Sequence, residues 1–79
     1  MTNNMNEFLE KVAAVLEVPS VMPATEFRAV EGWCSLMAFG LLVLLDQTYG
    51  KTLAVEDFMG LRTVADLAAV AGVEMAETT

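Results

Sequence analysis

The sequence predicts a small all-α protein, a four-helix bundle with three main helices and one short helix. Apolar residues near the start of the chain recur at three- and four-residue spacing, which is typical of an amphipathic helix. A long apolar, helix-compatible stretch follows in the middle, and prolines and glycines separate the helical stretches. At 79 residues the chain is expected to form a single domain, residues 1–79. A core of this size contributes only about 3–5 kcal/mol of net stability against unfolding.

The first predicted helix covers residues 4–17. Its apolar positions, Met5, Phe8 and Val12 among them, share one face, and an asparagine is available to cap its start. A long loop over residues 18–34 follows, because its prolines disfavour helical geometry in the residues before them. We expect Trp33 to anchor this loop to the body of the protein.

The second predicted helix covers residues 35–49 and ends at Gly50, since glycine readily adopts the left-handed conformation after a helix. It is apolar nearly all round, so part of it could meet a partner or a cargo instead of the core. Leu36, Phe39, Leu42, Leu45 and Tyr49 form one apolar stripe along this helix. We expect the core to contain Phe39, Leu42 and Leu45 of this stripe together with Phe58, Leu61 and Leu67, a set that could also line a pocket for an acyl chain.

Two further helices complete the bundle. Residues 55–59 form the short one, which we expect to be marginal and to move when cargo enters, because Ala54 cannot cap it. Residues 63–71 form the last helix, and Thr63 with Asp66 resembles a capping box at its start.

Composition excludes several classes of function. Eleven acids against 4 bases give a net charge of −7, which repels nucleic acid and anionic lipid and favours partners with basic patches. One cysteine and no histidine leave no ordinary zinc site, no disulfide framework and no usual general base. We therefore expect no metal, no catalytic residues and no enzymatic activity.

The sequence also gives expectations about location. Residues 1–4 lack the basic start and apolar run of a secretory signal, so we expect the cytoplasm. The apolar stretch over residues 33–45 is shorter than the roughly 20 residues that a transmembrane helix needs, so we expect no membrane insertion.

Four segments together resemble an acyl carrier protein in order and spacing. They are residues 24–28 (ATEFR), 32–36 (GWCSL), 46–50 (DQTYG) and 61–67 (LRTVADL). The resemblance extends from Glu7 to Val70, and the four matching distances make it more specific than any one segment.

The resemblance implies a four-helix fold and a covalent phosphopantetheine group on Ser35, where Ser35 and Leu36 match the end of the Asp-Ser-Leu motif of the family. A phosphopantetheinyl transferase attaches the group from coenzyme A. The implied role is to hold acyl or aminoacyl intermediates as thioesters in fatty-acid, polyketide or related biosynthesis, while synthase or ligase enzymes act on them.

Physical reasoning from the residues agrees with this role. Ser35 needs no local base, since the modifying enzyme supplies one, and a helix start offers unpaired N–H groups to a phosphodiester. The acidic body suits transient docking on basic patches of partner enzymes, and we expect a monomer.

Two features of the sequence depart from the family pattern. Cys34 stands in place of the motif aspartate, and a thiol is a poor acceptor for the first-turn N–H groups, so stability falls by about 0.5–2 kcal/mol. Met37, Ala38 and Gly40 occupy the outer face of the second helix, where the family usually has acids, so recognition relies more on apolar contacts.

These considerations predict two sets of site residues. The partner-binding set consists of Trp33, Met37, Asp46, Glu56 and Asp57. The cargo pocket consists of Phe39, Leu42, Phe58 and Leu61.

Three alternatives stay open at this point. The chain could be a carrier-like scaffold that is no longer modified because Cys34 replaces the aspartate. It could be an obligate helical oligomer that uses the apolar face of the second helix. Cys34 could also be a nucleophile, although the chain contains no histidine to activate it.

Overall fold

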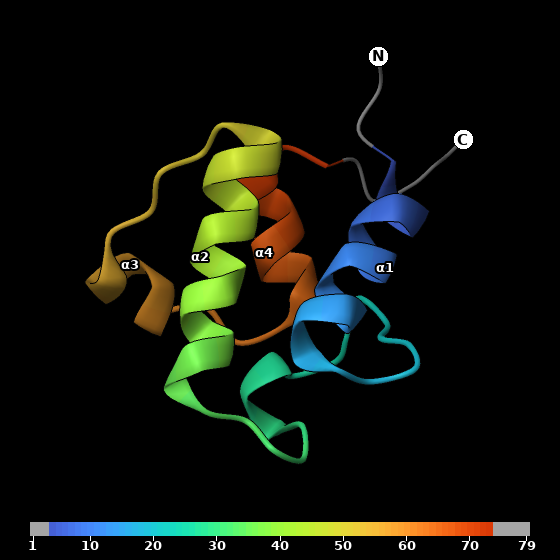
Figure 1. Cartoon of the computed structure of the whole chain (residues 1–79). Coiled ribbons are helices and arrows are strands. Elements are labelled where there is room, and N and C mark those ends of the chain that lie inside the picture. Colours follow the sequence, from blue (N-terminus) through green and yellow to red (C-terminus); the bar gives the residue numbers. More distant parts are fainter. Residues whose placement is uncertain (1–3, 74–79) are drawn as a thin grey trace.

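The computed structural model describes residues 4–73 and confirms the all-α fold class with three main helices and a short one. In the view of Figure 1, α4 is seen between α1 and α2, which also contact each other directly, and α3 lies on the far side of α2. The elements in chain order are α1 (Met5–Leu16), a 3-10 turn (Phe27–Ala29), α2 (Ser35–Tyr49), α3 (Val55–Met59) and α4 (Val64–Ala71).

Helix α1 begins at a side-chain cap. The Asn4 side-chain oxygen accepts hydrogen bonds from the backbone N–H groups of Asn6 (2.7 Å) and Glu7 (3.3 Å). The helix ends at Glu17, which adopts the left-handed conformation with φ of 59°. Its buried face carries Phe8, Val12, Ala13 and Leu16.

Helix α2 buries only part of the expected stripe. Leu45 is buried and Leu42 packs against the core, but Phe39 is 63% exposed, so the expectation that Phe39 belongs to the core is wrong. Leu36, at the start of the stripe, is 75% exposed, and Leu41 is buried. An α-helix turns about 100° per residue, so residues three apart are separated by about 300°, which is about 60° short of a full turn. Leu36 and Leu45 are three such steps apart. The shortfall adds up to about 180°, so these two residues lie on opposite faces of the helix. Because α2 is apolar nearly all round, hydrophobicity alone does not mark its buried face.

The long loop is joined to the start of α4 by backbone hydrogen bonds. The N–H of Val64 donates to the carbonyl of Thr25 (2.9 Å), and the N–H of Ala65 donates to the carbonyl of Pro23 (2.8 Å). These bonds satisfy two donors of the first turn of α4, which have no acceptor within the helix. The loop is thus fixed to the body of the protein at its centre.

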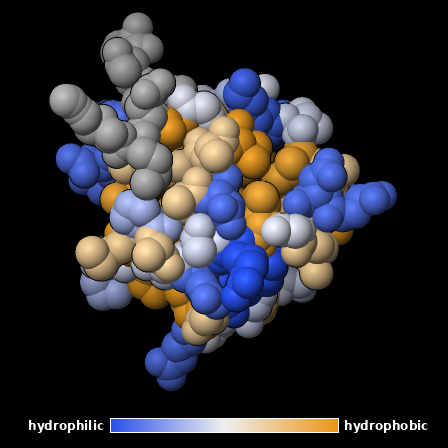
Figure 2. Space-filling model, turned by 180° about the vertical axis from the view of Figure 1, so that it is seen from behind, coloured by the Kyte–Doolittle hydropathy of each residue, from blue (hydrophilic) through white to orange (hydrophobic). Residues whose placement is uncertain are grey.

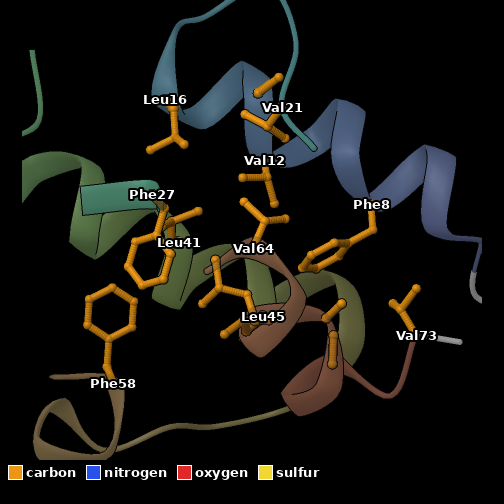
Figure 3. Packing of buried hydrophobic residues seen from close by; sticks show 14 residues of the cluster. Phe8, Val12, Leu16, Val21, Phe27, Leu41, Leu45, Phe58, Val64 and Val73 are labelled. Atoms are coloured by element: carbon orange, nitrogen blue, oxygen red, sulfur yellow. The ribbon is translucent and has the colours of Figure 1, made fainter. Parts of the chain in front are cut away.

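Aromatic packing fixes the end of the loop that leads into α2. The rings of Phe27 and Trp33 lie 5.7 Å apart between centroids, and those of Phe27 and Phe58 lie 5.4 Å apart. Figure 3 shows Phe27 and Phe58 pointing toward one another, beside Leu41 from α2. Phe27 is fully buried and Trp33 is half-buried, so Trp33 has the position of the expected loop anchor.

The short helix α3 has no side-chain cap, as the alanine at residue 54 implies. Arg28 secures its carboxyl end instead, because its guanidinium donates to the carbonyl oxygens of Phe58 (3.4 Å), Met59 (3.1 Å) and Leu61. The same guanidinium lies 5.0 Å from the ring centroid of Phe27 and 5.8 Å from that of Phe58. Arg28 therefore ties α3 to the loop and to the aromatic core.

Several large apolar side chains remain exposed, as the small size and apolar composition of the chain imply. Figure 2 shows hydrophobic atoms reaching the surface between hydrophilic side chains on the face turned away in Figure 1. The large exposed residues are Met22, Leu36, Phe39, Val43, Val55 and Met59. Within residues 4–73, no helix has both the length and the apolar character to cross a membrane.

Candidate functional site

Ser35 is the first residue of α2, and the structure leaves it exposed. Cys34 precedes it with extended backbone angles, φ −153° and ψ 171°, so the chain enters the helix directly at the serine. The positions on both sides, Cys34 and Leu36, are exposed as well. The serine hydroxyl is thus accessible to a modifying enzyme at the amino end of a fifteen-residue helix.

The start of α2 differs from the starts of the other two long helices. Asn4 caps α1, and at α4 the Thr63 hydroxyl accepts from the N–H of Asp66 at 3.2 Å. No side chain caps α2, and its first turn contains no acidic residue. The positive end of the α2 dipole is therefore neither capped nor neutralised by the residues that the structure describes.

This helix start fits a phosphodiester. The carbonyl of Cys34 already accepts from the N–H groups of Met37 (3.0 Å) and Ala38 (3.3 Å). The N–H groups of Ser35 and Leu36 have no acceptor within the helix, because they lie in its first turn. A phosphate esterified to the Ser35 hydroxyl would find these donors within one turn of the helix, in the orientation that favours an anion.

The residues of the predicted partner-binding set lie at different places. Trp33 and Met37 are half-buried near the start of α2. Asp46 is exposed in the last turn of α2 and accepts a hydrogen bond from the Thr52 hydroxyl at 3.1 Å. Glu56 and Asp57 are exposed in the first turn of α3. The acidic members thus lie away from Ser35 along the chain, and their role in partner binding stays a prediction.

The predicted cargo pocket does not form a single cluster. Phe58 belongs to the buried core, and Leu42 and Leu61 pack against that core. Phe39 is instead exposed on the other side of α2, where it lines a groove together with Val15 of α1. Leu42, Phe58 and Leu61 therefore lie in or against the core, whereas Phe39 belongs to a different surface, and the role of these residues in cargo binding stays a prediction.

Arrangements that could support catalysis are sparse. The chain has no histidine, and within residues 4–73 no cluster of metal-binding side chains is present. Cys34 is a free, exposed thiol, and no hydrogen bond is formed between it and a base among the described residues. A thiolate nucleophile normally has such a partner.

Comparison with protein families decides the identity of the domain. The family model described as phosphopantetheine attachment site matches residues 6–71, which include Ser35 and all of the four helices except Met5. The chain belongs to this family of acyl carrier protein-type domains. Members carry a covalently attached phosphopantetheine group and are generally non-catalytic carriers that interact with modifying and synthase enzymes. No curated protein and no solved structure gave a significant match.

The interpretation of the sequence missed two features of the structure, the contacts of Arg28 and the close approach of α1 at Gly40. The contacts of Arg28 with α3 depend on residues about 30 positions away, for which the sequence contains no local signal. Gly40 did offer a signal, because a glycine inside a helix often marks a close approach of another element. The structure places Val15 of α1 at this point.

Proposed function

We propose that this carrier domain holds acyl or aminoacyl groups as thioesters on a phosphopantetheine arm attached to Ser35. The observation that carries the proposal is the start of α2, where an exposed serine occupies the first position of a long helix without a cap or an acid. The family match shows that the domain carries phosphopantetheine, and the geometry favours Ser35 as the attachment point.

The residues at this site have distinct roles in the proposal. The Ser35 hydroxyl forms the ester, and the first-turn N–H groups of Ser35 and Leu36 face the phosphodiester. Cys34 leaves these donors free because its side chain makes no capping bond. The arm supplies the terminal thiol on which cargo is held. The transferase supplies the base, which suits a chain without histidine.

Partner enzymes of this proposed carrier are a phosphopantetheinyl transferase and synthases or ligases of fatty-acid, polyketide or related biosynthesis. The net charge of −7 favours partners with basic docking patches. Charged contacts are available at Asp46, Glu56 and Asp57, whereas Trp33 and Met37 offer apolar contacts beside Ser35. The exposed thiol of Cys34 suits the reducing cytoplasm, which is the location that we propose.

Intact-mass spectrometry after incubation with coenzyme A and a promiscuous transferase tests the attachment. We expect the wild-type chain to gain the mass of one phosphopantetheine, and Ser35→Ala to gain none. The matched control Cys34→Ser keeps the serine and removes the only thiol, so it should still gain the mass. A gain that persists in Ser35→Ala would place the group elsewhere.

A second candidate function is a carrier-like scaffold without the arm. It is favoured by Cys34, which occupies the position of the motif aspartate and makes no capping hydrogen bond. In that case the wild-type chain gains no mass, whereas Cys34→Asp regains modification because the family motif is restored. The same mass measurement therefore separates the two functions.

A further inference from the structure

A groove between α1 and α2 begins beside the proposed attachment point. It has a volume of about 620 Å³, within the range of ligand sites. Its apolar lining includes Val15, Cys34, Leu36, Phe39, Gly40 and Val43. Cys34 and Leu36 are the two chain neighbours of Ser35, so one end of the groove adjoins the serine.

Gly40 allows α1 and α2 to approach closely at the bottom of the groove. A Cβ atom at this position would lie 2.9 Å from the Cγ1 atom of Val15, closer than side chains normally approach, so glycine permits the observed contact of α1 with α2. On the outer side, Leu36, Phe39 and Val43 are 75%, 63% and 39% exposed. These three side chains follow one another at helical spacing and form an apolar row about 10 Å long.

The position of this row favours a ligand that is tethered to Ser35. A flexible arm keeps its cargo at a high effective concentration near the attachment point, so even a shallow apolar groove is occupied. Burial of the apolar row and of an apolar chain then removes both from water, which is favourable in proportion to the area covered.

The interior offers less ready access for a chain. Phe58 is only 2% exposed and packs against Phe27, and Arg28 bonds the carbonyl groups at the end of α3. A chain that entered between α2 and α3 would have to break these contacts first. The groove between α1 and α2 is already open and needs no such rearrangement.

The charge of the groove indicates which chains it accepts. Among the described residues that line it, Glu17 is the only charged one, and no basic side chain is present. A carboxylate at the end of a chain would meet an acidic rim without a cation to pair with. A neutral apolar chain avoids this repulsion.

We propose that the α1–α2 groove binds the acyl chain of the cargo on Ser35, and that it prefers neutral apolar chains over carboxylate-terminated ones. This inference rests on the proposed function for the origin of the cargo. It assigns the cargo chain to a surface groove and not to the protein interior, and it adds a selectivity that the carrier role does not contain.

Nuclear magnetic resonance of the loaded protein tests the site. The transferase loads the arm from coenzyme A, octanoyl-coenzyme A or succinyl-coenzyme A, and amide chemical shifts are compared. We expect octanoyl loading to shift Val15, Gly40 and Val43 relative to the unacylated arm, and succinyl loading to leave them unchanged. Octanoyl shifts centred on Phe58 and Leu61, or no shifts at all, would overturn the inference.

A pair of charge-matched variants separates the groove from general surface effects. Val43→Glu places a carboxylate at the far end of the groove, and we expect it to abolish the octanoyl-dependent shifts at Val15. Val55→Glu introduces the same charge at a 66% exposed position on α3, outside the groove lining, and should leave the shifts unchanged. Equal loss in both variants would contradict a specific site.

A chemically attached chain keeps the test independent of the transferase. In the double variant Cys34→Ser, Ser35→Cys, the single thiol at residue 35 reacts with octyl methanethiosulfonate and carries an octyl chain. We expect the same three residues to shift relative to the methyl adduct. If the wild-type protein gains no phosphopantetheine but this adduct shifts the groove, the proposed function fails while the binding site stands. If the adduct leaves the groove unchanged, the inference itself fails.

Discussion

Cys34 leaves the start of α2 without the side-chain acceptor that stabilises most helix starts. We predict that Cys34→Asp raises the free energy of unfolding by about 0.5–2 kcal/mol, because a carboxylate accepts from the first-turn N–H groups and interacts favourably with the dipole. For a domain of this size, each 1 kcal/mol corresponds to roughly 4–8 °C in Tm. Thermal unfolding under reducing conditions measures the change, and Cys34→Ala, which adds no acceptor, should give no gain.

Asp66, unlike Cys34, stabilises the start of its helix, α4. Its carboxylate accepts from the N–H groups of Arg62 (2.9 Å) and Thr63 (3.1 Å), and these bonds lower the pKa of Asp66 below its ordinary value. The lowered pKa means that the stabilisation is fully present above the ordinary pKa of an aspartate and is lost as pH falls through the folded-state pKa.

We therefore predict that acid weakens the wild-type protein more than Asp66→Asn. The amide does not titrate, so the variant starts less stable at neutral pH and loses less on acidification. Urea unfolding at a series of acidic pH values measures both curves. Parallel curves would show that the carboxylate of Asp66 does not control the acid response.

At the scale of the elements, α3 depends on a residue outside it. Arg28 bonds the carbonyl groups of Phe58, Met59 and Leu61, and α3 itself has neither a cap nor the length of a stable isolated helix. Hydrogen bonds that involve a charged group contribute about 1.5–3 kcal/mol. We predict that Arg28→Lys destabilises the protein by about 1–2 kcal/mol. The ammonium group of lysine lacks the planar set of N–H groups with which the guanidinium reaches these carbonyl oxygens.

Hydrogen exchange locates the effect of this substitution. The N–H of Leu61, which donates to the carbonyl of Phe58 at 3.0 Å, should exchange faster in Arg28→Lys, while amides in the middle of α1 should keep their protection relative to global unfolding. Arg62→Lys is a matched control, since among the described residues the side chain of Arg62 forms only an exposed ion pair with Glu26 at 3.8 Å. Uniform acceleration in Arg28→Lys would contradict a local role.

The elements differ in how far local sequence determines them. The starts of α1 and α4 follow from short-range chemistry, because Asn4 and Thr63 cap donors within the next three residues. The buried face of α2 does not follow from local sequence. Apolar residues surround this helix nearly evenly, so no polar side marks which face is exposed. The location of Ser35 at the start of α2 follows from local pattern, whereas the groove beside it requires the contact of Gly40 with Val15, which only the packing of two helices creates.

At the scale of the whole molecule, most of the acidic charge lies outside α2, the helix that carries the exposed apolar row of Leu36, Phe39 and Val43. The chain carries a net charge of −7, yet Asp46 is the only charged residue in α2. Acidic side chains on the other elements can guide encounter with basic partners over a distance, whereas the row of Leu36, Phe39 and Val43 can act only on contact. The apolar row on α2 therefore contributes little to long-range attraction, which comes mainly from acids on the other elements.

The net charge and the small area of the exposed apolar row together predict a monomer. Stable interfaces bury about 800 Å² on each partner, and three side chains that are already partly covered offer only a fraction of that area. Two copies, each with a net charge of −7, also repel one another. We predict that sedimentation under reducing conditions gives a monomer at low and at physiological salt.

Oxidation and high salt are expected to cause association of copies in two different ways, through a disulfide and through apolar contact. In air, the exposed Cys34 should give a disulfide-linked dimer that Cys34→Ser abolishes, because the described chain has no other thiol. At about 1 M salt, where the Debye length falls to about 3 Å, repulsion is screened and weak association through the apolar row should appear. Phe39→Ser should remove this salt-induced association, and Met59→Ser, at a similarly exposed position on α3, should not. A stable dimer of Cys34→Ser at low salt would instead mean that apolar contact outweighs the charge and that α2 is an interface between copies.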